Sequence, residues 1–224
     1  MTAANGSADE RPPAADPSML LTMVTTEHFT LQGARANTVS ESTARAGLYV
    51  GSLSASLVAL GLLGQSSSGR TAFDAFVLIV LPALYAVGTF TFVRLAESSV
   101  EDLTYGRAIN RIRGYYRQLA GPDDRYFALG GHDDVAGVLA NMGLVQPSRW
   151  QLWFTLATMV ETLNGVVGAS ALAYAADRLG LRLAGACAVG AAAGIASILA
   201  SQAWQRRMHL HADERADVLF PSVP

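Results

Sequence analysis

Residues 75–93 read AFVLIVLPALYAVGTFTFV, and residues 46–64 read AGLYVGSLSASLVALGLLG. Neither stretch holds a charged residue, and each approaches the roughly 20 residues that a helix needs to cross about 30 Å of hydrocarbon. Two more stretches, at about 152–175 and 183–203, are of similar length and almost uncharged. Because backbone groups in lipid must be hydrogen-bonded within their own segment, each stretch should be helical. The sequence therefore predicts an all-α fold: a four-transmembrane-helix membrane protein with two hairpins.

The overall composition favours the same fold class. Of the 224 residues, 51% are apolar and 15% are charged, against roughly 25% charged residues in soluble domains. All 16 basic residues are arginine, and with 18 acidic residues the net charge is −2, so no basic field favours nucleic acid. Cys187 is the single cysteine, which excludes an internal disulfide and a cysteine-based metal site. We expect no nucleic-acid partner and no cofactor.

The distribution of arginine predicts the orientation. Thirteen of the arginines lie before the first span, between the second and third spans, or after the fourth. Only Arg70, Arg178 and Arg182 lie in the two remaining loops. Under the positive-inside rule this places both termini and the middle segment in the cytoplasm, with the spans in the inner cell membrane.

The chain is thereby divided into six segments. Residues 1–17 lack large apolar residues after Met1 and any secretion signal, so we expect a disordered tail. The other five segments are a cytoplasmic helix leading into the first span (18–45), the first transmembrane hairpin (46–97), a cytoplasmic linker (98–149), the second transmembrane hairpin (150–204) and a cytoplasmic tail (205–224). Pro82 should kink the second span, and Trp150 and Trp153 should anchor the third at the membrane interface.

The cytoplasmic linker carries a basic amphipathic pattern. Ser98 and Glu101 have the form of a capping box, which predicts that a helix begins there. Apolar and aromatic residues then recur at helical spacing, at Tyr105, Ile109, Ile112, Tyr116 and Leu119, while other sectors of the helix hold Arg107, Arg111, Arg113 and Arg117. These arginines either form a solvated face or bind anionic lipid headgroups along the inner leaflet, with nucleic-acid contact the least favoured interpretation.

The end of this linker should be a short helix. Gly121 and Pro122 should break the amphipathic helix, and Asp133 could cap a new one that ends at Gly143.

Glu161 is the residue that most suggests a functional site. It lies nine positions past residue 152, about 13 Å into the hydrocarbon and close to the midplane. A carboxylate there costs a few kcal/mol, so an intramembrane polar site is the default hypothesis. With no basic residue at comparable depth, we expect a largely neutral acid that is hydrogen-bonded to some of Thr158, Asn164, Ser52 and Ser56. It is either an interhelical clamp or a group that handles ions or protons.

Small residues on three spans predict close helix packing. Gly165 continues the helical face that begins at Glu161. Similar rows contain Gly47 and Gly51 in the first span, and Gly190 and Gly194 in the fourth. Such rows let helix backbones approach closely, either within one chain or between copies in a homo-oligomer.

The remaining polar motifs give little sign of chemistry. His209 and His211 stand beside acids in the tail, and His132 precedes two aspartates, but both patterns are weak for zinc in a flexible segment. Cys187 lies among small apolar residues, where a thiol is inert, and no GxSxG motif is present. We therefore expect no metal site and no enzyme.

Two stretches resemble a known group of proteins. Residues 25–65, TTEHFTLQGARANTVSESTARAGLYVGSLSASLVALGLLGQ, and residues 109–116, INRIRGYY, resemble small multi-pass membrane proteins of high-GC actinobacteria that carry no assigned function. In architecture alone, a cytoplasmic helix that runs into a helical hairpin is similar to the two-span membrane effectors of bacterial nucleotide-signalled defence systems. The resemblance implies a membrane location and transfers no functional residue.

Together these observations predict an integral membrane protein that acts by interaction. We expect a scaffold or sensor component working from its cytoplasmic face, in contact with the lipid bilayer and with anionic lipid headgroups, a cytoplasmic protein or a second copy of the chain. The alternative is an ion or proton permeation protein that uses Glu161, and a gated defence effector would be one form of it.

Overall fold

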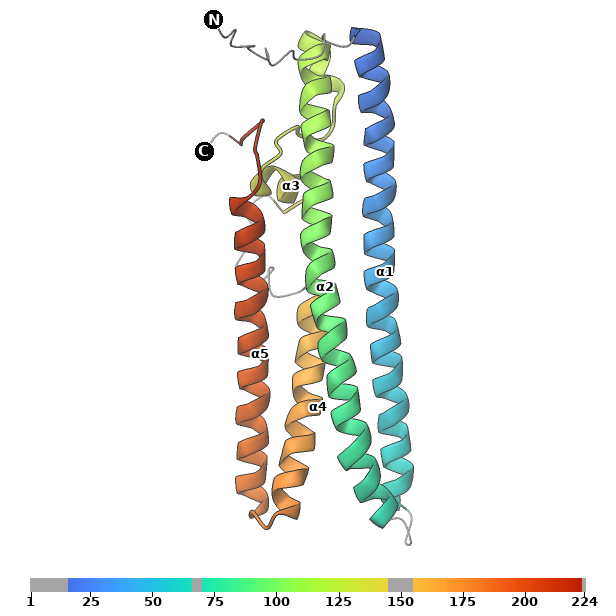
Figure 1. Ribbon diagram of the computed structural model, residues 1–224, viewed down its shortest axis with the longest axis vertical. Coiled ribbons are helices and arrows are strands. Elements are labelled where there is room, and N and C mark those ends of the chain that lie inside the picture. The colour runs from blue at the N-terminus through green and yellow to red at the C-terminus, as the bar shows by residue number, and fades with distance from the viewer. Residues whose placement is uncertain (1–15, 66–69, 145–154, 223–224) are drawn as a thin grey trace, which may run out of the picture.

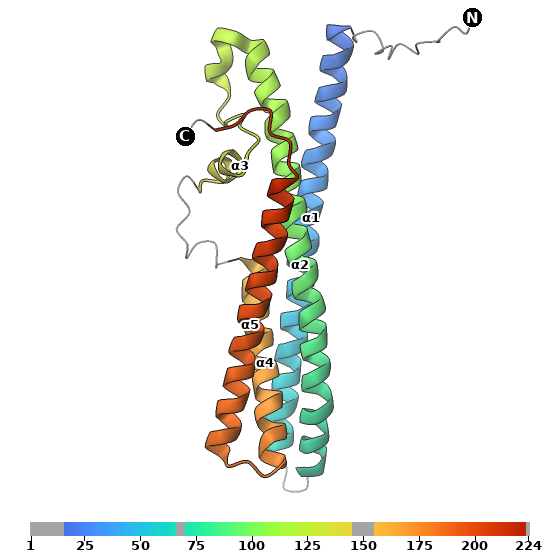
Figure 2. The same ribbon diagram turned by 60° about the vertical axis from the view of Figure 1, so that its left-hand side comes forward.

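The computed structural model describes residues 16–65, 70–144 and 155–222, and within these ranges all regular secondary structure is helical. In chain order the elements are α1 (Pro17–Gln65), α2 (Arg70–Ala120), the 3-10 helix η1 (Gly121–Tyr126), α3 (Val135–Asn141), α4 (Leu156–Arg178) and α5 (Leu183–Glu214). Helix α2 packs along both α1 and α4, and α4 packs along α5 (Figures 1 and 2). The predictions for residues 1–15 and for Trp150 and Trp153 lie outside the described residues.

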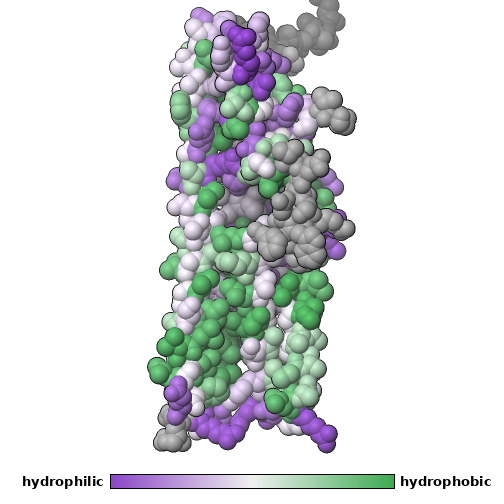
Figure 3. Space-filling model, turned by 180° about the vertical axis from the view of Figure 1, so that it is seen from behind, coloured by the Kyte–Doolittle hydropathy of each residue, from purple (hydrophilic) through white to green (hydrophobic). Residues whose placement is uncertain are grey.

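Four of these helices have the length and apolar character needed to cross a membrane. They are α1, α2, α4 and α5, which confirms the predicted number of apolar spans. Seen from behind, hydrophobic residues gather over one half of the molecule and hydrophilic residues over the other (Figure 3). We call these the apolar half, comprising residues 46–65, 70–93, 156–178 and 183–203, and the polar half, comprising residues 16–45, 94–144 and 204–222.

Helices α1 and α2 run without a break from one half to the other. They contain 49 and 51 residues, so each is about 75 Å long at 1.5 Å per residue. The prediction that a separate helix begins at Ser98 was wrong, because α2 continues through Ser98 and buries it to 5% exposure. The pair Arg94 and Glu97, spaced i and i+3 at 2.9 Å, supports the helix across this point. Helix α2 is likewise continuous through Pro82.

Two hydrophobic clusters form the core of the apolar half. The first contains Tyr49, Phe92 and Val160, and the second contains Leu81 and Val167. Both clusters contain residues of α1, α2 and α4. Helices α2 and α4 lie at the centre of the bundle, because α2 packs against α1 and α4, and α4 packs against α2 and α5. In lipid such packing is driven by van der Waals contact and hydrogen bonding, since the surrounding acyl chains are as apolar as leucine.

Within the chain, the small residues of α4 and α5 pack closely against each other, whereas the row on α1 does not pack against a described helix and its packing between copies stays a prediction. A Cβ atom added at Gly190 would lie 2.4 Å from the Ala169 carbonyl oxygen, and one at Gly194 would lie 2.8 Å from the Gly165 oxygen. These glycines let the two helix backbones touch. By contrast, a Cβ at Gly47 or Gly51 would meet nothing within 4 Å, because α1 turns that row away from the bundle.

The polar half is completed by α3 and the end of the chain. Helix α2 ends at Ala120, as predicted, and Gly121 takes a φ of 54° in the turn that follows. The cap of α3 is Asp134 and not Asp133, since the Asp134 side chain accepts from the Gly137 N–H at 2.7 Å. Helix α3 lies against α2 at Gly106, where a Cβ would come within 2.8 Å of Val138.

Candidate functional site

Glu161 lies at the centre of a hydrogen-bonded chain inside the apolar half. Its side chain is 1% exposed. The hydroxyls of Ser197 and Ser201 on α5 donate to its Oε1 atom at 3.2 and 3.0 Å. Ser197 also shares a hydrogen bond of 2.8 Å with the Tyr85 hydroxyl on α2. The two serines are four residues apart, so one face of α5 presents both to the same carboxyl group.

Asn164, one turn further along α4, makes a second set of buried contacts. It is fully buried, its Oδ1 accepts from the Tyr49 hydroxyl at 3.2 Å, and its Nδ2 donates to Thr89 Oγ1 at 3.1 Å. A Cβ at Gly88 would lie 2.1 Å from Asn164 Oδ1, so the glycine leaves the space that the amide fills. The Asn164 contacts thus join α4 to α1 and α2.

Thr158 extends the same row toward the polar half. Its hydroxyl hydrogen-bonds with that of Thr155 at 2.9 Å and accepts from Gln202 Nε2 at 3.3 Å. No hydrogen bond between two side chains joins these three sets of contacts to one another among the described residues. We call the three neighbouring sets together the buried polar network, which consists of Tyr49, Tyr85, Thr89, Thr158, Glu161, Asn164, Ser197, Ser201 and Gln202. All four long helices contribute to it.

The network lies off the centre of α4. Glu161 is five residues from the first residue of α4, about 8 Å, while 17 residues, about 25 Å, follow it to Arg178. The expectation that Glu161 lies close to the bilayer midplane stays a prediction, although Glu161 is not at the middle of α4. It lies nearer the end of the apolar half that adjoins the polar half.

Three of the five predicted members of the intramembrane site come together, and two do not. Glu161, Asn164 and Thr158 belong to the buried polar network. Ser52 and Ser56 do not contact Glu161, because their hydroxyls donate to the Leu48 and Ser52 carbonyls of their own helix. Helix α1 instead directs Tyr49 and Leu53 inward.

Sequence reasoning missed Tyr49, Tyr85, Thr89, Ser197, Ser201 and Gln202. Ser197 and Ser201 stand four residues apart in an Ala-rich and Gly-rich segment, a spacing that places both hydroxyls on one helix face. Ser52 and Ser56 have the same spacing in a similar segment, so the spacing alone does not identify the serines that contact Glu161.

The chemistry of the network is that of one acid among neutral donors. Among the described residues, no basic side chain lies within ion-pair distance of Glu161. The described ranges also hold no group of three or more His, Cys, Asp or Glu residues placed to bind a metal ion. The arrangement can link helices, and its carboxyl group and hydroxyls are also the kinds of group that pass protons or coordinate a monovalent cation.

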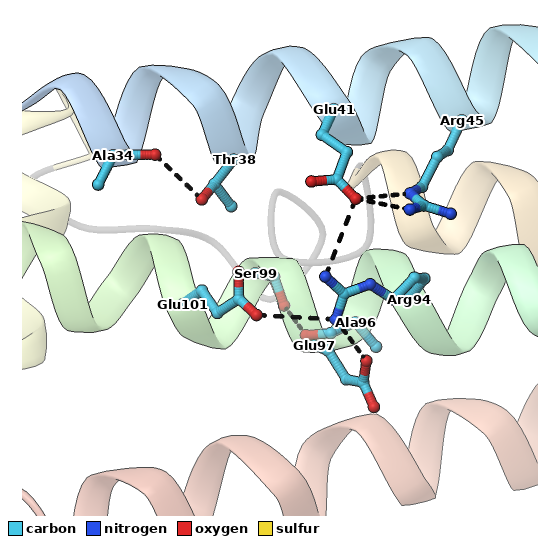
Figure 4. Close-up of polar contacts among 9 residues, drawn as sticks. All are labelled: Ala34, Thr38, Glu41, Arg45, Arg94, Ala96, Glu97, Ser99 and Glu101. Carbon is cyan, nitrogen blue, oxygen red and sulfur yellow. Dashed lines mark hydrogen bonds and ion pairs between the residues drawn. The ribbon is translucent and has the colours of Figure 1, made fainter.

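Charged residues border the apolar half on α1 and α2. Arg94 contacts Glu97 at 2.9 Å, Glu101 at 3.7 Å and Glu41 of α1 at 3.9 Å. Glu41 also pairs with Arg45 at 2.7 Å, so its carboxylate contacts arginines of both α1 and α2 (Figure 4). An ion pair thus joins α1 to α2 near the point where the uncharged segments of both helices begin.

The four arginines predicted to meet lipid headgroups all contact other groups of this chain. Arg107, 8% exposed, pairs with Asp213 of α5, and Arg111 pairs with Asp133 at 2.8 Å. Arg117 pairs with Asp124 at 2.9 Å, and Arg113 donates to the Asn110 Oδ1 atom at 2.9 Å. These contacts compete with headgroups for the guanidinium groups, and headgroup binding stays a prediction.

Residues near the C-terminus are hydrogen-bonded to α2 and to the start of α3. We call residues 217–222 the C-terminal strap. Asp133 is fully buried and accepts from the Phe220 N–H at 2.7 Å and the Leu219 N–H at 3.1 Å. Asp134 accepts from the Ser222 N–H at 2.7 Å. The expectation of a flexible tail was therefore wrong for these residues.

The electrostatics of the strap follow from these contacts. Burial alone would raise the pKa of Asp133, but the Phe220 N–H, the Arg111 guanidinium and the Leu219 N–H hold it below its ordinary value. Burial acts in the same way on Asp134, and hydrogen bonds from Ser222 and Gly137 lower its pKa. Both carboxyl groups are therefore held as anions that bind the strap.

His209 and His132 each form a hydrogen bond to another segment of the chain. His209 shares a hydrogen bond of 3.1 Å with Ser99 of α2, and Asp213 pairs with Arg107. His132 shares one of 3.1 Å with the Pro221 carbonyl. These contacts fix the end of α5 and the strap onto α2 and α3.

No protein-family model, curated protein or solved structure matches this chain. The resemblance to actinobacterial membrane proteins and the architectural likeness to defence effectors therefore stay predictions, and the function has to be argued from the geometry.

Proposed function

We propose that the protein is an interaction or sensor component of the inner cell membrane, with both termini and the polar half in the cytoplasm. The observation that carries this proposal is the continuity of α1 and α2 through both halves. A partner or signal that moves the polar half acts directly on helices that also hold the buried polar network. A coupling claim of this kind needs a physical connection, and an unbroken helix is one.

Helix α5 supplies a second connection between the halves. Ser197 and Ser201 contact Glu161 inside the apolar half, and Asp213 of the same helix pairs with Arg107 in the polar half. Three of the four long helices thus join the buried polar network to the polar half.

Exposed apolar side chains near the start of α1 favour a protein partner. Met19, Met23 and Phe29 are 61%, 58% and 68% exposed. They lie 16 or more residues before Arg45, and so at least about 24 Å from the apolar half. Exposed apolar side chains at this distance from lipid offer contact area to a protein partner.

Photo-crosslinking in native membranes tests this proposal. A photoreactive amino acid at Phe29 should give a protein adduct, whereas one at Val166, an exposed position of α4 in the apolar half, should react with lipid. Adducts to a distinct protein or to a second copy would support the proposal. Monomer alone at position 29 would overturn it.

The second candidate function is ion or proton permeation, and Glu161 is the observation that favours it. It is a buried carboxyl group linked through Ser197 to Tyr85 and flanked by Ser201. Buried polar residues within membrane spans are frequent elements of ion and proton pathways.

Flux in proteoliposomes tests this second function. Ion or proton flux that falls with both Glu161→Gln and Glu161→Ala, but not with Glu27→Gln on the exposed surface of α1, would support it. Absence of flux would exclude permeation, and flux unchanged by the Glu161 variants would place the pathway elsewhere. A gated effector would depolarise cells only after its signal is supplied.

A further inference from the structure

A groove of about 610 Å³ lies in the polar half between α1, α2 and the end of α3. Its polar lining includes Arg35 from α1, with Asp102 and Arg113 from α2. Its apolar lining includes Val39 and Met142. The groove has a size suited to a small organic molecule.

The charges in this groove do not balance. Arg35 and Asp102 form a two-point pair, with Nε to Oδ1 at 2.8 Å and Nη2 to Oδ2 at 3.1 Å. Arg113 has no carboxylate within ion-pair distance in the described part of the chain, and its Nη1 atom donates only to the neutral Asn110 side chain. The groove therefore carries one uncompensated guanidinium group.

The surroundings of Arg113 make this positive charge costly. Burial lowers the pKa of Arg113, and the nearby charge of Arg35 lowers it further. Next along α1, burial lowers the pKa of His28, and Arg113 adds to the effect. The His28 Nδ1 atom is buried without a hydrogen-bond partner among the described residues, while its Nε2 atom contacts Gln32, another lining residue. A negative ligand would relieve this excess of positive charge.

The position of the groove distinguishes a soluble ligand from a lipid. Arg35 lies 10 residues before Arg45, and Arg113 lies 19 residues after Arg94. These separations place the two side chains about 15 and 28 Å along the helices from the apolar half. The headgroup layer of a bilayer is only about 5–8 Å thick on each side, so a bilayer lipid does not reach them.

We propose that this groove binds a small soluble anion, a phosphate-bearing or carboxylate-bearing molecule with an apolar portion, held between Arg113 and Arg35. Guanidinium groups recognise such oxyanions through paired N–H donors. The apolar portion would lie against Val39 and Met142. The inference deepens the proposed function, on which it rests for its role, by naming the class of signal that the polar half would receive.

Calorimetric titration of the full chain in phosphatidylcholine nanodiscs tests the proposal. The probe is phenyl phosphate, with inorganic phosphate and benzyl alcohol to separate the anionic and apolar contributions. We expect saturable binding that Arg113→Gln weakens at least about tenfold, as loss of a charge-assisted contact should. Arg125→Gln is the matched control, because Arg125 lies on η1 with its side chain 69% exposed and should leave affinity unchanged.

A second variant keeps the test decisive if Arg113→Gln does not fold. Asp102→Asn removes the carboxylate that occupies Arg35, so affinity for phenyl phosphate should rise several-fold. No saturable binding at millimolar phenyl phosphate, or equal affinity in all variants, would overturn the proposal. Binding seen only when the nanodiscs contain phosphatidylglycerol would indicate a lipid headgroup and would also overturn it. Partner capture and ion flux are separate measurements, so failure of this test is distinguishable from failure of the proposed function.

Discussion

The two halves of the molecule bury their carboxyl groups in different ways. Asp133 in the polar half faces a guanidinium group, from Arg111, and two backbone N–H groups. Glu161 in the apolar half faces two serine hydroxyls. Asp133 is anchored by charge, and Glu161 is anchored by neutral hydrogen bonds.

The difference reflects the solvent around each half. Arg111 keeps 37% of its side chain exposed, so water still solvates part of the pair with Asp133. In hydrocarbon both ions of a pair would lose their hydration, which costs several kcal/mol per ion. Hydroxyl donors satisfy a carboxyl group there without adding a second buried charge. The comparison can be tested by changing the two acids and the packing around them.

The largest effect is expected for Asp133→Ala. The change removes the acceptor of two backbone N–H groups and leaves Arg111 unpaired, so we expect a loss of about 3–4 kcal/mol in the local stability of the C-terminal strap. Hydrogen exchange of residues 217–222 measures this loss directly. Asp124→Ala, which removes an exposed partner of Arg117, is the control and should cost less than about 1 kcal/mol. Equal protection of the strap in both variants would contradict its anchoring by Asp133.

The second effect separates two substitutions of Glu161. Glu161→Ala leaves the Ser197 and Ser201 hydroxyls without their acceptor and opens a cavity, so thermal unfolding in detergent should report a loss of about 3 kcal/mol. Glu161→Gln keeps an acceptor oxygen and most of the volume, and should cost less than about 1 kcal/mol. If Gln were as damaging as Ala, the carboxyl group would be held by more than neutral hydrogen bonds.

The third effect compares two glycines. Gly190→Ala brings a methyl group to 2.4 Å from the Ala169 carbonyl oxygen, so α4 and α5 must separate, at a cost of about 1–3 kcal/mol. Gly51→Ala meets open space and should leave the unfolding temperature of the monomer unchanged. A loss of oligomer in Gly51→Leu, with the monomer still folded, would instead assign the outer face of α1 to a second copy.

The smallest effect is a dependence of the strap on pH. The folded-state pKa values of Asp133 and Asp134 are lowered, so their stabilisation is complete above the unfolded value of about 3.9 and is lost as pH falls through the folded values. A nitroxide at Val218→Cys, in a Cys187→Ser background, should stay immobile down to about pH 4 and become more mobile only below it. In Asp133→Asn the label should be mobile already at neutral pH. A label that became mobile already at pH values well above 4 would contradict the sign of these shifts.

The apolar helices could be predicted from sequence, because crossing hydrocarbon demands about 20 uncharged residues in a row. A helix over 18–45 leading into the first span was also expected, and α1 extends over both segments. Its packing against α2 could not be predicted. Within the polar half its inward face includes His28, Arg35 and Thr38, so no apolar stripe marks the helix as packed. Its contact with α2 depends on pairs such as Arg35 with Asp102, which are distant in sequence.

The candidate site could be predicted in part, because hydrocarbon also makes a charged side chain costly. Glu161 is conspicuous because a lone carboxyl group in an apolar run is costly, whichever neighbour it has. Its partners depend on which face each helix turns inward. Ser52 and Ser197 are equally plausible donors by composition, and only tertiary packing turns Ser52 outward and Ser197 toward Glu161.

Pro82 divides α2 into a short segment and a much longer one. Pro82 has no backbone N–H, so one intrahelical hydrogen bond is missing at that point. From Arg70 to Pro82 the helix spans 12 residues, about 18 Å, and from Pro82 to Ala120 it spans 38 residues, about 57 Å. A tilt of about 5° at Pro82 would move the far end by about 5 Å over that length. This displacement exceeds the 3.2 Å contact between Tyr116 and Thr25 that joins α2 to α1 there. A tilt at Pro82 would therefore shift the contacts near Ala120 much more than those near Arg70.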